Sequence, residues 1–519
     1  MAAAIGLFAV AGCSSSPGPT TSTSTGSSSL VVGMTYAPKA LNPDYVYDPA
    51  DYYIMDNIYS RLVNYGYDYQ VHGDLATKWT TSTDGLVYTF SLVKGVTWSD
   101  GKALTSADVK WTIDSIIAEK GYGAAALAGI TDVTTPDPTT VVLTLGSPNS
   151  SFLDQLAQRY GWVVLPKHVF DGTDVTTNPA NTAPIGSGPF VVTSFQPGQS
   201  VQLKANPHYF GGAPKLDNLS FRFFSSSDAA VSALQTGEIQ FMANAPSYSS
   251  IPTLQQTKGI TVETANAAPP TDVWLGFNLA RKPLSDLSVR TAISSAINPD
   301  QINKLVYGGT KKVTHTVYDP SSRSYDKAAM QPAFNVKKAN KLLDDAGYPK
   351  NASGIRFSLT YTGFTASLGG ADKIGEVLKQ QLAAIGVDLT LENDDFSVFA
   401  DKIMTKHDFD ITWSGGPHGP DPQTLANYVA TTGNRNAMQY SNPTVDELFA
   451  KAKATTDAAA QNRYYTQIQK IIAADMPRYT LFQWNYQFPF ASKYSGFWWQ
   501  KAAGGTVPAD DYRLVTVTG

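Results

Sequence analysis

No single hydrophobic core can hold a chain of 519 residues. Folded chains longer than roughly 250–300 residues divide into separate domains, so two or three domains are expected here. Hydrophobic residues make up 42% of the chain and charged residues 16%, which leaves enough apolar surface to bury against the entropy of the unfolded chain. The sequence therefore predicts a globular protein of several domains.

The charged and metal-binding residues exclude several classes of protein. The net charge is −4, and no basic run is long enough to follow a phosphate backbone, so we expect no nucleic-acid partner. A single cysteine cannot form an intramolecular disulfide. The six histidines show no HExxH or other paired spacing typical of zinc sites. We therefore expect neither a metal site nor a cofactor.

The only cysteine, Cys13, stands between an apolar segment and a polar one. Residues 2–11 form a short apolar segment that resembles the end of a secretory signal rather than a membrane span, which needs about 20 apolar residues. The tetrapeptide Val10–Cys13 resembles a bacterial lipobox, in which cleavage precedes a lipidated cysteine. A buried free cysteine is the alternative, but residues 14–29 contain only Ser, Thr, Gly and Pro. We therefore predict a lipoprotein.

The N-terminal segments then have distinct expected roles. Residues 1–12 are predicted to be the remnant of a signal peptide, and residues 13–29 a lipid-anchored flexible tether. No Lys or Arg precedes the apolar segment, so we expect translation to begin upstream. The globular part should lie in the cell envelope, in the periplasm or at the outer face of the cytoplasmic membrane.

The pattern of apolar residues predicts an α/β chain. Residues Leu86–Val93 alternate as a strand does, and Thr105 with Asp108 three positions later predicts a capped helix. In the second half the helical segments are longer, and one that ends before Gly386 leads directly into the alternating strand Val387–Leu391. We therefore predict a strand-rich first half and a helix-rich second half.

Signals for catalysis are weak. The segment Gly186–Phe190 lacks the Lys-Ser/Thr of a phosphate-binding loop, so a turn is predicted there, and no GxSxG motif is present. The acid pairs Asp344-Asp345 and Asp394-Asp395 lie on amphipathic or turn-like sequence, where a solvated face is the ordinary explanation. We expect no enzyme, with a secreted hydrolase that uses Asp394 and Asp395 as the alternative.

A binding site is better supported. Trp413 begins the segment WSGGPHGPDPQTL, which follows the strand-like residues Phe409–Thr412. The glycines and prolines predict an irregular loop, and an aromatic residue at a strand end beside such a loop can form a pocket wall. Packing in the core is the alternative for Trp413, and equally for Trp484 and Tyr47.

An ordered series of segments extends this interpretation. The series includes TYAPKALNPDYVYD, IYSRLVNYG, YTFSLVKGVTWSDGKALTSADV, PIGSGPF, LGFNLARKPLSDLSVRTAISSAINPDQI and the segment that begins at Trp413. It resembles the family-five extracellular solute-binding proteins, which are the dipeptide- and oligopeptide-binding components of ABC importers, with nickel- and oligosaccharide-binding relatives. The resemblance covers nearly everything from Leu30 onward.

The resemblance implies a two-lobed clamshell, like the type II periplasmic binding proteins but with an extra subdomain. Lobe I would comprise residues 30–60, 184–270 and 486–519, with residues 61–183 as the extra subdomain, and lobe II would comprise residues 271–485. The lobes would close on a solute and present it to the ABC permease subunits in the membrane. Closure is then driven by the ligand's higher affinity for the closed form. We expect a monomer.

The resemblance also implies where a ligand would lie. In peptide-binding members an Asp just after the Trp holds the α-ammonium of the peptide, and Gly415 or Gly416 occupies that place here. Asp421 is the candidate replacement. An extended ligand would also run beside Tyr47 and Asp48, and near Tyr122. The complete set of predicted ligand contacts is Trp413, Asp421, Tyr47, Asp48, Tyr122, Gly415, Gly416 and Trp484.

The ligand class has two interpretations. A peptide, recognised mainly through its backbone, is the first. An oligosaccharide that stacks on Trp and Tyr faces is the alternative, since it would not need the missing acid. Nickel-binding relatives carry a His where this chain has Gln423, and His418 is nearby without a partner, so nickel is not expected.

Overall fold

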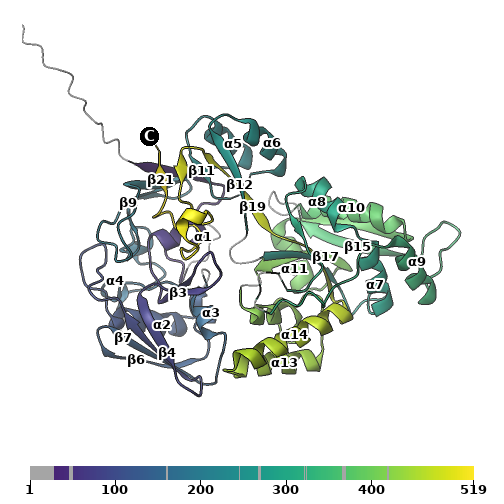
Figure 1. The fold of residues 1–519 in the computed structure, drawn as a ribbon, viewed down its shortest axis with the longest axis horizontal. Helices are drawn as coiled ribbons and strands as arrows, with labels where there is room; N and C mark the ends of the chain where they lie inside the picture. The colour runs from purple at the N-terminus through teal and green to yellow at the C-terminus, as the bar shows by residue number, and fades with distance from the viewer. Residues whose placement is uncertain are drawn as a thin grey trace, which may run out of the picture.

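The computed structural model describes residues 28–45, 51–158, 162–244, 246–266, 271–318, 320, 322, 324–364, 370–417 and 420–518. The described residues exclude Cys13, residues 14–27 of the predicted tether, Tyr47, Asp48 and His418. Ser29, which is predicted to end the tether, instead begins strand β1 (Ser29–Met34). The described part is an α/β chain with two lobes side by side (Figure 1). The predicted fold class is therefore confirmed.

Lobe I is built on a seven-stranded sheet in the order β12-β19-β11-β1-β10-β9-β8. The strands are β1 (Ser29–Met34), β8 (Phe190–Gln196), β9 (Ser200–Ala205), β10 (Asn218–Phe223), β11 (Phe241–Met242), β12 (Ile260–Asn266) and β19 (Asn485–Ala491). The helices are α1 (Asp51–Ile54), α5 (Ser227–Gln235) and α6 (Ile251–Gln256). Because β19 comes from near the C-terminus, lobe I is discontinuous in sequence.

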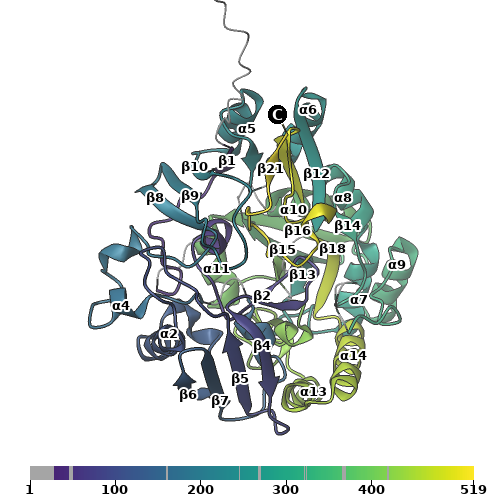
Figure 2. The same ribbon diagram turned by 60° about the vertical axis from the view of Figure 1, so that its left-hand side comes forward.

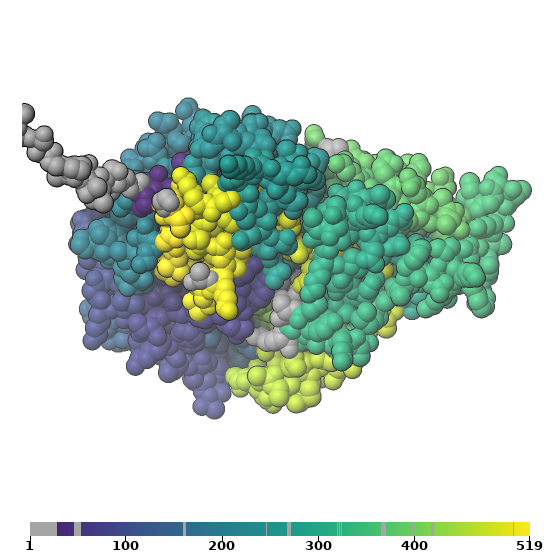
Figure 3. Space-filling model, turned by 45° about the horizontal axis from the view of Figure 1, so that its top comes forward, coloured from purple at the N-terminus to yellow at the C-terminus, as the bar shows by residue number. Residues whose placement is uncertain are grey.

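The C-terminal segment also returns to lobe I. It carries the short strands β20 (Tyr494–Ser495) and β21 (Thr516–Val517) and lies against the first lobe, where Figure 3 shows it in yellow. The ring of Phe497 lies 5.0 Å from that of Phe241 in β11, so aromatic packing fixes this segment on the sheet.

A four-stranded antiparallel sheet in the order β4-β5-β7-β6 forms a separate core beside lobe I. The elements of this region are β2 (Val63–Tyr65), β3 (Val71–Gly73), β4 (Ala76–Thr81), β5 (Val87–Leu92), α2 (Ser106–Ala118), β6 (Ile130–Asp137), β7 (Thr140–Leu145), α3 (Phe152–Leu156) and α4 (Lys167–Phe170). The predicted cap of α2 is confirmed, because the backbone N–H of Thr105 donates to the Asp108 carboxylate at 2.8 Å.

Lobe II is built on a six-stranded sheet in the order β14-β18-β13-β17-β15-β16. The strands are β13 (Thr271–Phe277), β14 (Lys312–Val313), β15 (Phe357–Phe364), β16 (Val387–Asp394), β17 (Ile411–Pro417) and β18 (Arg478–Gln483). The helices are α7 (Leu287–Ala296), α8 (Pro299–Tyr307), α9 (Val336–Asp345), α10 (Ala371–Ala383), α11 (Phe396–Met404), α12 (Ala426–Val429), α13 (Pro443–Ala454) and α14 (Ala458–Asp475). The predicted helix-to-strand unit is α10 followed by β16.

The predicted loop after Thr412 is wrong in its first part. Strand β17 continues to Pro417, and its register with β13 pairs Trp413 with Leu275 and Gly416 with Asp272. Glycine weakens a strand because it has no side chain to pack, but hydrogen bonding to β13 keeps this stretch extended. The local pattern could not reveal a partner so distant in sequence.

Two strands carry the chain between the lobes (Figures 1 and 2). In the sheet of lobe I the pairing of β12 with β19 runs up to Asn266 and Asn485, and in lobe II Asp272 pairs with Gln483. Between these pairs the backbone N–H of Trp484 donates to the carbonyl of Thr271 at 2.7 Å. The two crossings are therefore hydrogen-bonded to each other. The exact residue boundaries of the lobes remain predictions.

The extra sheet region touches lobe II at α13 (Figure 1). Ser150, in the loop between β7 and α3, donates its backbone N–H to the carbonyl of Lys453 and its hydroxyl to that of Ala452, both at 2.9 Å. These carbonyls belong to the last turn of α13, where a helix lacks internal partners for them. Gln461 of α14 donates to the Ser150 hydroxyl at 2.6 Å. We call these four residues the rim contact.

Ser150→Ala is expected to lower the free energy of unfolding by about 1 kcal/mol, the usual net value of a lost hydrogen bond. Ser147→Ala, in the same loop but with an exposed side chain, is the matched control and should leave that free energy unchanged. Urea unfolding followed by tryptophan fluorescence measures both. Equal values for the two variants would show that the rim contact contributes nothing.

Candidate functional site

The predicted residues of the Trp413 segment lie at one edge of the lobe II sheet. Strands β15, β16 and β17 run parallel, and their carboxyl ends meet there, with Phe364 of β15 beside Asp394 of β16. Ligands of open α/β sheets bind outside the carboxyl ends of such strands. Figures 1 and 2 place α11, which follows β16, on the side of lobe II turned toward lobe I.

Trp413 has features of both of its predicted roles. Its half-buried ring meets Phe364 edge to face, with centroids 5.0 Å apart, and it packs against the lobe II core. The indole N–H is buried and has no hydrogen-bond partner among the described residues. A buried donor without an acceptor is costly, so an acceptor that reached this N–H would remove that cost.

Gly416 could not be replaced by an acid without rearrangement. A Cβ at this position would overlap the hydroxyl of Tyr428, a buried residue whose ring meets Trp274 at 5.1 Å. The guanidinium of Arg435 donates to the same hydroxyl at 3.0 Å. One of the two positions where peptide-binding relatives are expected to carry a carboxylate is therefore filled by a phenol with a cation beside it.

Gly416→Ala is expected to lower the free energy of unfolding by about 1–3 kcal/mol, the usual cost of forcing a carbon into filled space. In the Tyr428→Phe background the hydroxyl is gone, so the same substitution should cost less. A double-mutant cycle measured by urea unfolding isolates this difference. Equal costs of Gly416→Ala in both backgrounds would contradict the overlap.

Asp421 is buried, with an exposed fraction of 2%. It is the N-cap of the 3₁₀ helix Pro422–Leu425, and its carboxylate accepts from the backbone N–H of Gln423 at 3.1 Å. This is an ordinary capping role. A role in ligand binding stays a prediction, for which the cap gives no support.

Tyr122 and Trp484 lie on different parts of the molecule. Tyr122 is 43% exposed, and its backbone N–H donates to the carbonyl of Asp44 at 2.6 Å, shortly before the segment that holds Tyr47 and Asp48. Trp484 is half-buried at the crossing between β18 and β19. One predicted contact therefore belongs to the first half of the chain, and the other lies where the lobes join.

The crossing holds a buried lysine that the sequence analysis missed. Lys311 is 5% exposed, and its ammonium lies 3.7 Å from the ring centroid of Trp484, 4.8 Å from that of Tyr248 and 5.4 Å from that of Tyr307. It donates to the carbonyl of Asn485 at 2.5 Å. Cation–π contacts of this kind are worth most when desolvated. No motif in the sequence marks this cluster, because its members are far apart in the chain.

The Lys311 cluster also connects the lobes. Tyr248 lies just before α6 of lobe I, Tyr307 ends α8 of lobe II, and their rings meet edge to face at 5.0 Å. Burial lowers the pKa of the Lys311 ammonium well below its usual value and raises the pKa of both tyrosines. The ring faces offset only part of the desolvation cost of the ammonium.

At pH values between the lowered pKa of Lys311 in the native protein and the ordinary pKa of a lysine, the unfolded chain binds a proton at Lys311 and the native protein does not. Native stability should therefore rise with pH across that interval. The buried tyrosines act in the opposite sense only above about pH 10. Lys311→Met should abolish the rise between pH 7 and 9.5, as measured by urea unfolding. Lys312→Met, at an exposed neighbour, should keep it, and identical pH profiles for both variants would contradict this assignment.

Comparisons with known proteins decide the family. The model of the bacterial extracellular solute-binding proteins, family 5 middle region, matches residues 70–437. The chain belongs to this family. The predicted resemblance is thereby confirmed. The family is one of solute-binding proteins.

Relatives within family 5 match nearly the whole chain. A putative ABC transporter peptide-binding protein of Brucella ovis is 32% identical over 455 residues, which covers 83% of this chain and 82% of that protein. The substrate-binding protein CtaP of Listeria monocytogenes has a TM-score of 0.85 at 27% identity and covers 95% of this chain and 100% of its own. The oligopeptide-binding protein AppA of Bacillus subtilis, solved with a nonapeptide, has a TM-score of 0.75 at 25% identity, with coverage of 95% and 99%.

The described residues lack two further features. No helix in them combines the length and apolarity needed to cross a bilayer. They also contain no group of three or more His, Cys, Asp or Glu side chains placed to hold a metal ion.

Proposed function

We propose that this family 5 protein captures peptides between its two lobes and delivers them to the permease subunits of an ABC importer. The observation that carries the proposal is the similarity, across 95% of this chain, to AppA in complex with a nonapeptide. The relative from Brucella ovis, which is also named as peptide-binding, supports it.

The geometry fits such a role. Two hydrogen-bonded crossings let the lobes rotate as bodies, so a ligand that touches both can shift the population toward the closed form by its differential affinity. The carboxyl edge of lobe II, with Trp413, Gly415 and Gly416, would form one wall. Tyr47, Asp48 and Tyr122 would come from lobe I and its extra subdomain, and Trp484 from the crossing.

The proposal includes the place of the protein in the cell. Lipidation of Cys13 would tie a monomer to the outer face of the cytoplasmic membrane, with residues 14–27 as a tether. This arrangement would keep the binding protein near its permease without fixing its orientation.

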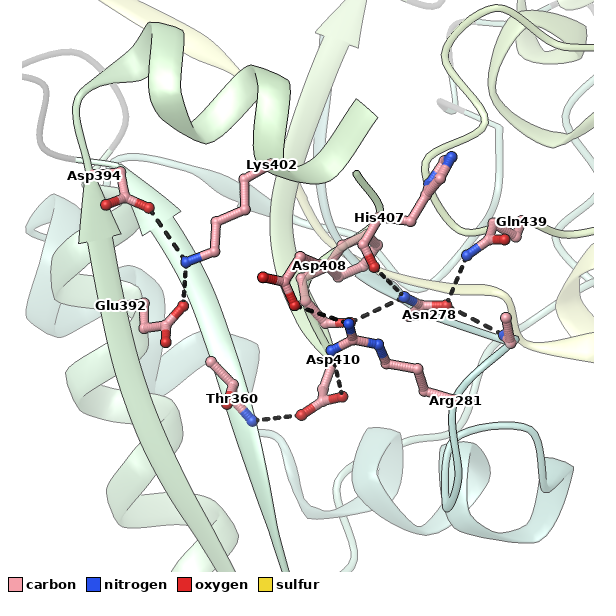
Figure 4. A network of polar contacts seen from close by, with 12 residues as sticks. Asn278, Arg281, Thr360, Glu392, Asp394, Lys402, His407, Asp408, Asp410 and Gln439 are labelled. Atoms are coloured by element: carbon pink, nitrogen blue, oxygen red, sulfur yellow. Dashed lines mark hydrogen bonds and ion pairs between the residues drawn. The ribbon is translucent and has the colours of Figure 1, made fainter. Parts of the chain in front are cut away.

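An oligosaccharide is the alternative ligand, and one observation favours it. The Tyr428 hydroxyl and the Arg435 guanidinium occupy the place beside Gly416, so this position cannot hold an ammonium group by charge. Hydrolysis is less well supported, because the Asp394 carboxylate forms an ion pair with Lys402 at 3.5 Å (Figure 4).

A thermal-shift screen of the full chain against short peptides and oligosaccharides tests the ligand class. Ligand at about a thousand times its Kd adds roughly 4 kcal/mol of stability. A shift with peptides supports the proposal, whereas a shift with sugars alone would replace the ligand. Return of intact ligand after denaturation would exclude the hydrolase.

Trp413→Ala should weaken binding of a peptide found in this screen by at least about tenfold, or roughly 1.4 kcal/mol, as measured by calorimetric titration. Trp79→Ala, at a half-buried tryptophan of β4 in the extra sheet, is the matched control and should bind normally. Unchanged affinity of Trp413→Ala with lowered stability would make Trp413 a core residue only.

A further inference from the structure

Four aromatic rings form a continuous group at the carboxyl edge of lobe II. Phe364 is central, with ring centroids 5.0 Å from Trp413, 4.9 Å from Phe399 and 5.3 Å from Phe396. Phe364 and Phe399 are buried, but Phe396 is 61% exposed. We call these four rings the aromatic patch.

The helix that carries the exposed ring of this patch lies on the side of lobe II that faces lobe I. Phe396 is the first residue of α11, and α11 lies toward lobe I in both ribbon views (Figures 1 and 2). In Figure 1, α13, which supplies the carbonyls of the rim contact, lies below this level, and α8, which ends at Tyr307 of the Lys311 cluster, lies above it. Helix α11 therefore lies between the two places where the lobes meet, where a bound solute could cover its exposed ring.

Carboxylates surround the patch. Lys402 of α11 lies close by, and its ammonium is already paired with Glu392 and with Asp394 (Figure 4). Asp395 is exposed and holds the N-cap position of α11, yet its side chain makes no capping hydrogen bond. The charge beside the exposed ring is therefore negative, which complements a cationic group on the solute.

Trp413 adds a buried hydrogen-bond donor to the aromatic patch. Its indole N–H has no acceptor among the residues that the structure describes, although the ring itself is held by Phe364. A solute that lays an apolar group on the patch would bring its own carbonyl groups close to this donor. The patch thus offers apolar contact, a donor and negative charge within one group of residues.

We infer that the aromatic patch binds an apolar side chain of the peptide ligand, with a neighbouring ammonium group of that peptide facing Asp394 and Asp395. The inference rests on the proposed peptide-binding function and narrows it to peptides that carry an apolar residue next to an ammonium group. That ammonium is either the α-ammonium of the first residue or a lysine side chain. The carboxylates that face this ammonium group are those of Asp394, at the end of β16, and Asp395, at the start of α11, and not one at Gly416 of β17.

Calorimetric titration of the full chain with Ala-Ala-Ala and Phe-Ala-Ala tests the apolar part. Wild type should bind Phe-Ala-Ala at least about tenfold more tightly. Phe396→Ala should reduce this preference to less than about threefold, because it weakens binding of Phe-Ala-Ala far more than binding of Ala-Ala-Ala. Phe334→Ala is the matched control, because Phe334 is 46% exposed just before α9, on a different part of lobe II (Figure 1).

The outcomes separate the inference from the proposed function. If neither tripeptide nor any longer peptide binds, the proposed function fails. If peptides bind but Phe396→Ala keeps the full preference, or weakens both peptides equally, the inference is wrong while the function stands. Phe396→Leu, which retains apolar surface, should keep most of the preference. An unchanged melting temperature of each variant would show that it is still folded.

N-acetylated peptides test the ammonium part and its source. Ac-Phe-Ala-Ala should bind about tenfold more weakly than Phe-Ala-Ala if the α-ammonium is the group recognised. If Phe-Ala-Ala and Ac-Phe-Ala-Ala bind equally weakly and Ac-Phe-Lys-Ala binds tightly, the group recognised is a lysine side chain instead. Asp395→Asn should remove the effect of acetylation, whereas Asp388→Asn, at the opposite end of β16 and exposed, should not. No effect of either acetylation or Asp395→Asn would overturn this part.

Discussion

The hydrogen-bonded pairing of the two crossing strands is the constraint on which the molecule depends. Between the last pair of the lobe I sheet and the first pair of the lobe II sheet, Trp484 donates to Thr271, so the two crossings are joined by a hydrogen bond among the described residues. The rim contact at Ser150 and the Lys311 cluster then limit how the lobes can approach each other.

Local sequence signals predicted the elements but not their long-range partners. The Thr105 and Asp108 cap and the passage from α10 into β16 are confirmed, because each depends on neighbours within a few residues. The sequence pattern ends strand β17 too early, because its glycines are held extended by pairing with β13, which is far away in the chain. Lys311 gave no sequence signal for the same reason, as Tyr248 and Trp484 come from distant segments.

The sequence shows that an acid is missing at Gly415 or Gly416, but it does not show what fills the space beside Gly416. From the sequence, a glycine at this position indicates only that no side chain is present. In the structure, the hydroxyl of Tyr428 fills the space that a side chain at Gly416 would need, and Arg435 donates to that hydroxyl. The carboxyl edge is therefore polarised, with a guanidinium beside β17 and carboxylates at the end of β16. A charged ligand would be oriented by this difference, because wrong alignment places like charges together.

The cost of burying Lys311 bears on how the lobes move. An ammonium without a carboxylate partner is unfavourable inside a protein, and here aromatic faces from both lobes supply most of its contacts. Separating Tyr248 from Tyr307 would return water to the ammonium while removing one of its rings. These two effects oppose each other, so opening at the crossing costs less than the loss of the aromatic contact alone. A ligand then needs only a modest difference in affinity between the two forms to shift their populations.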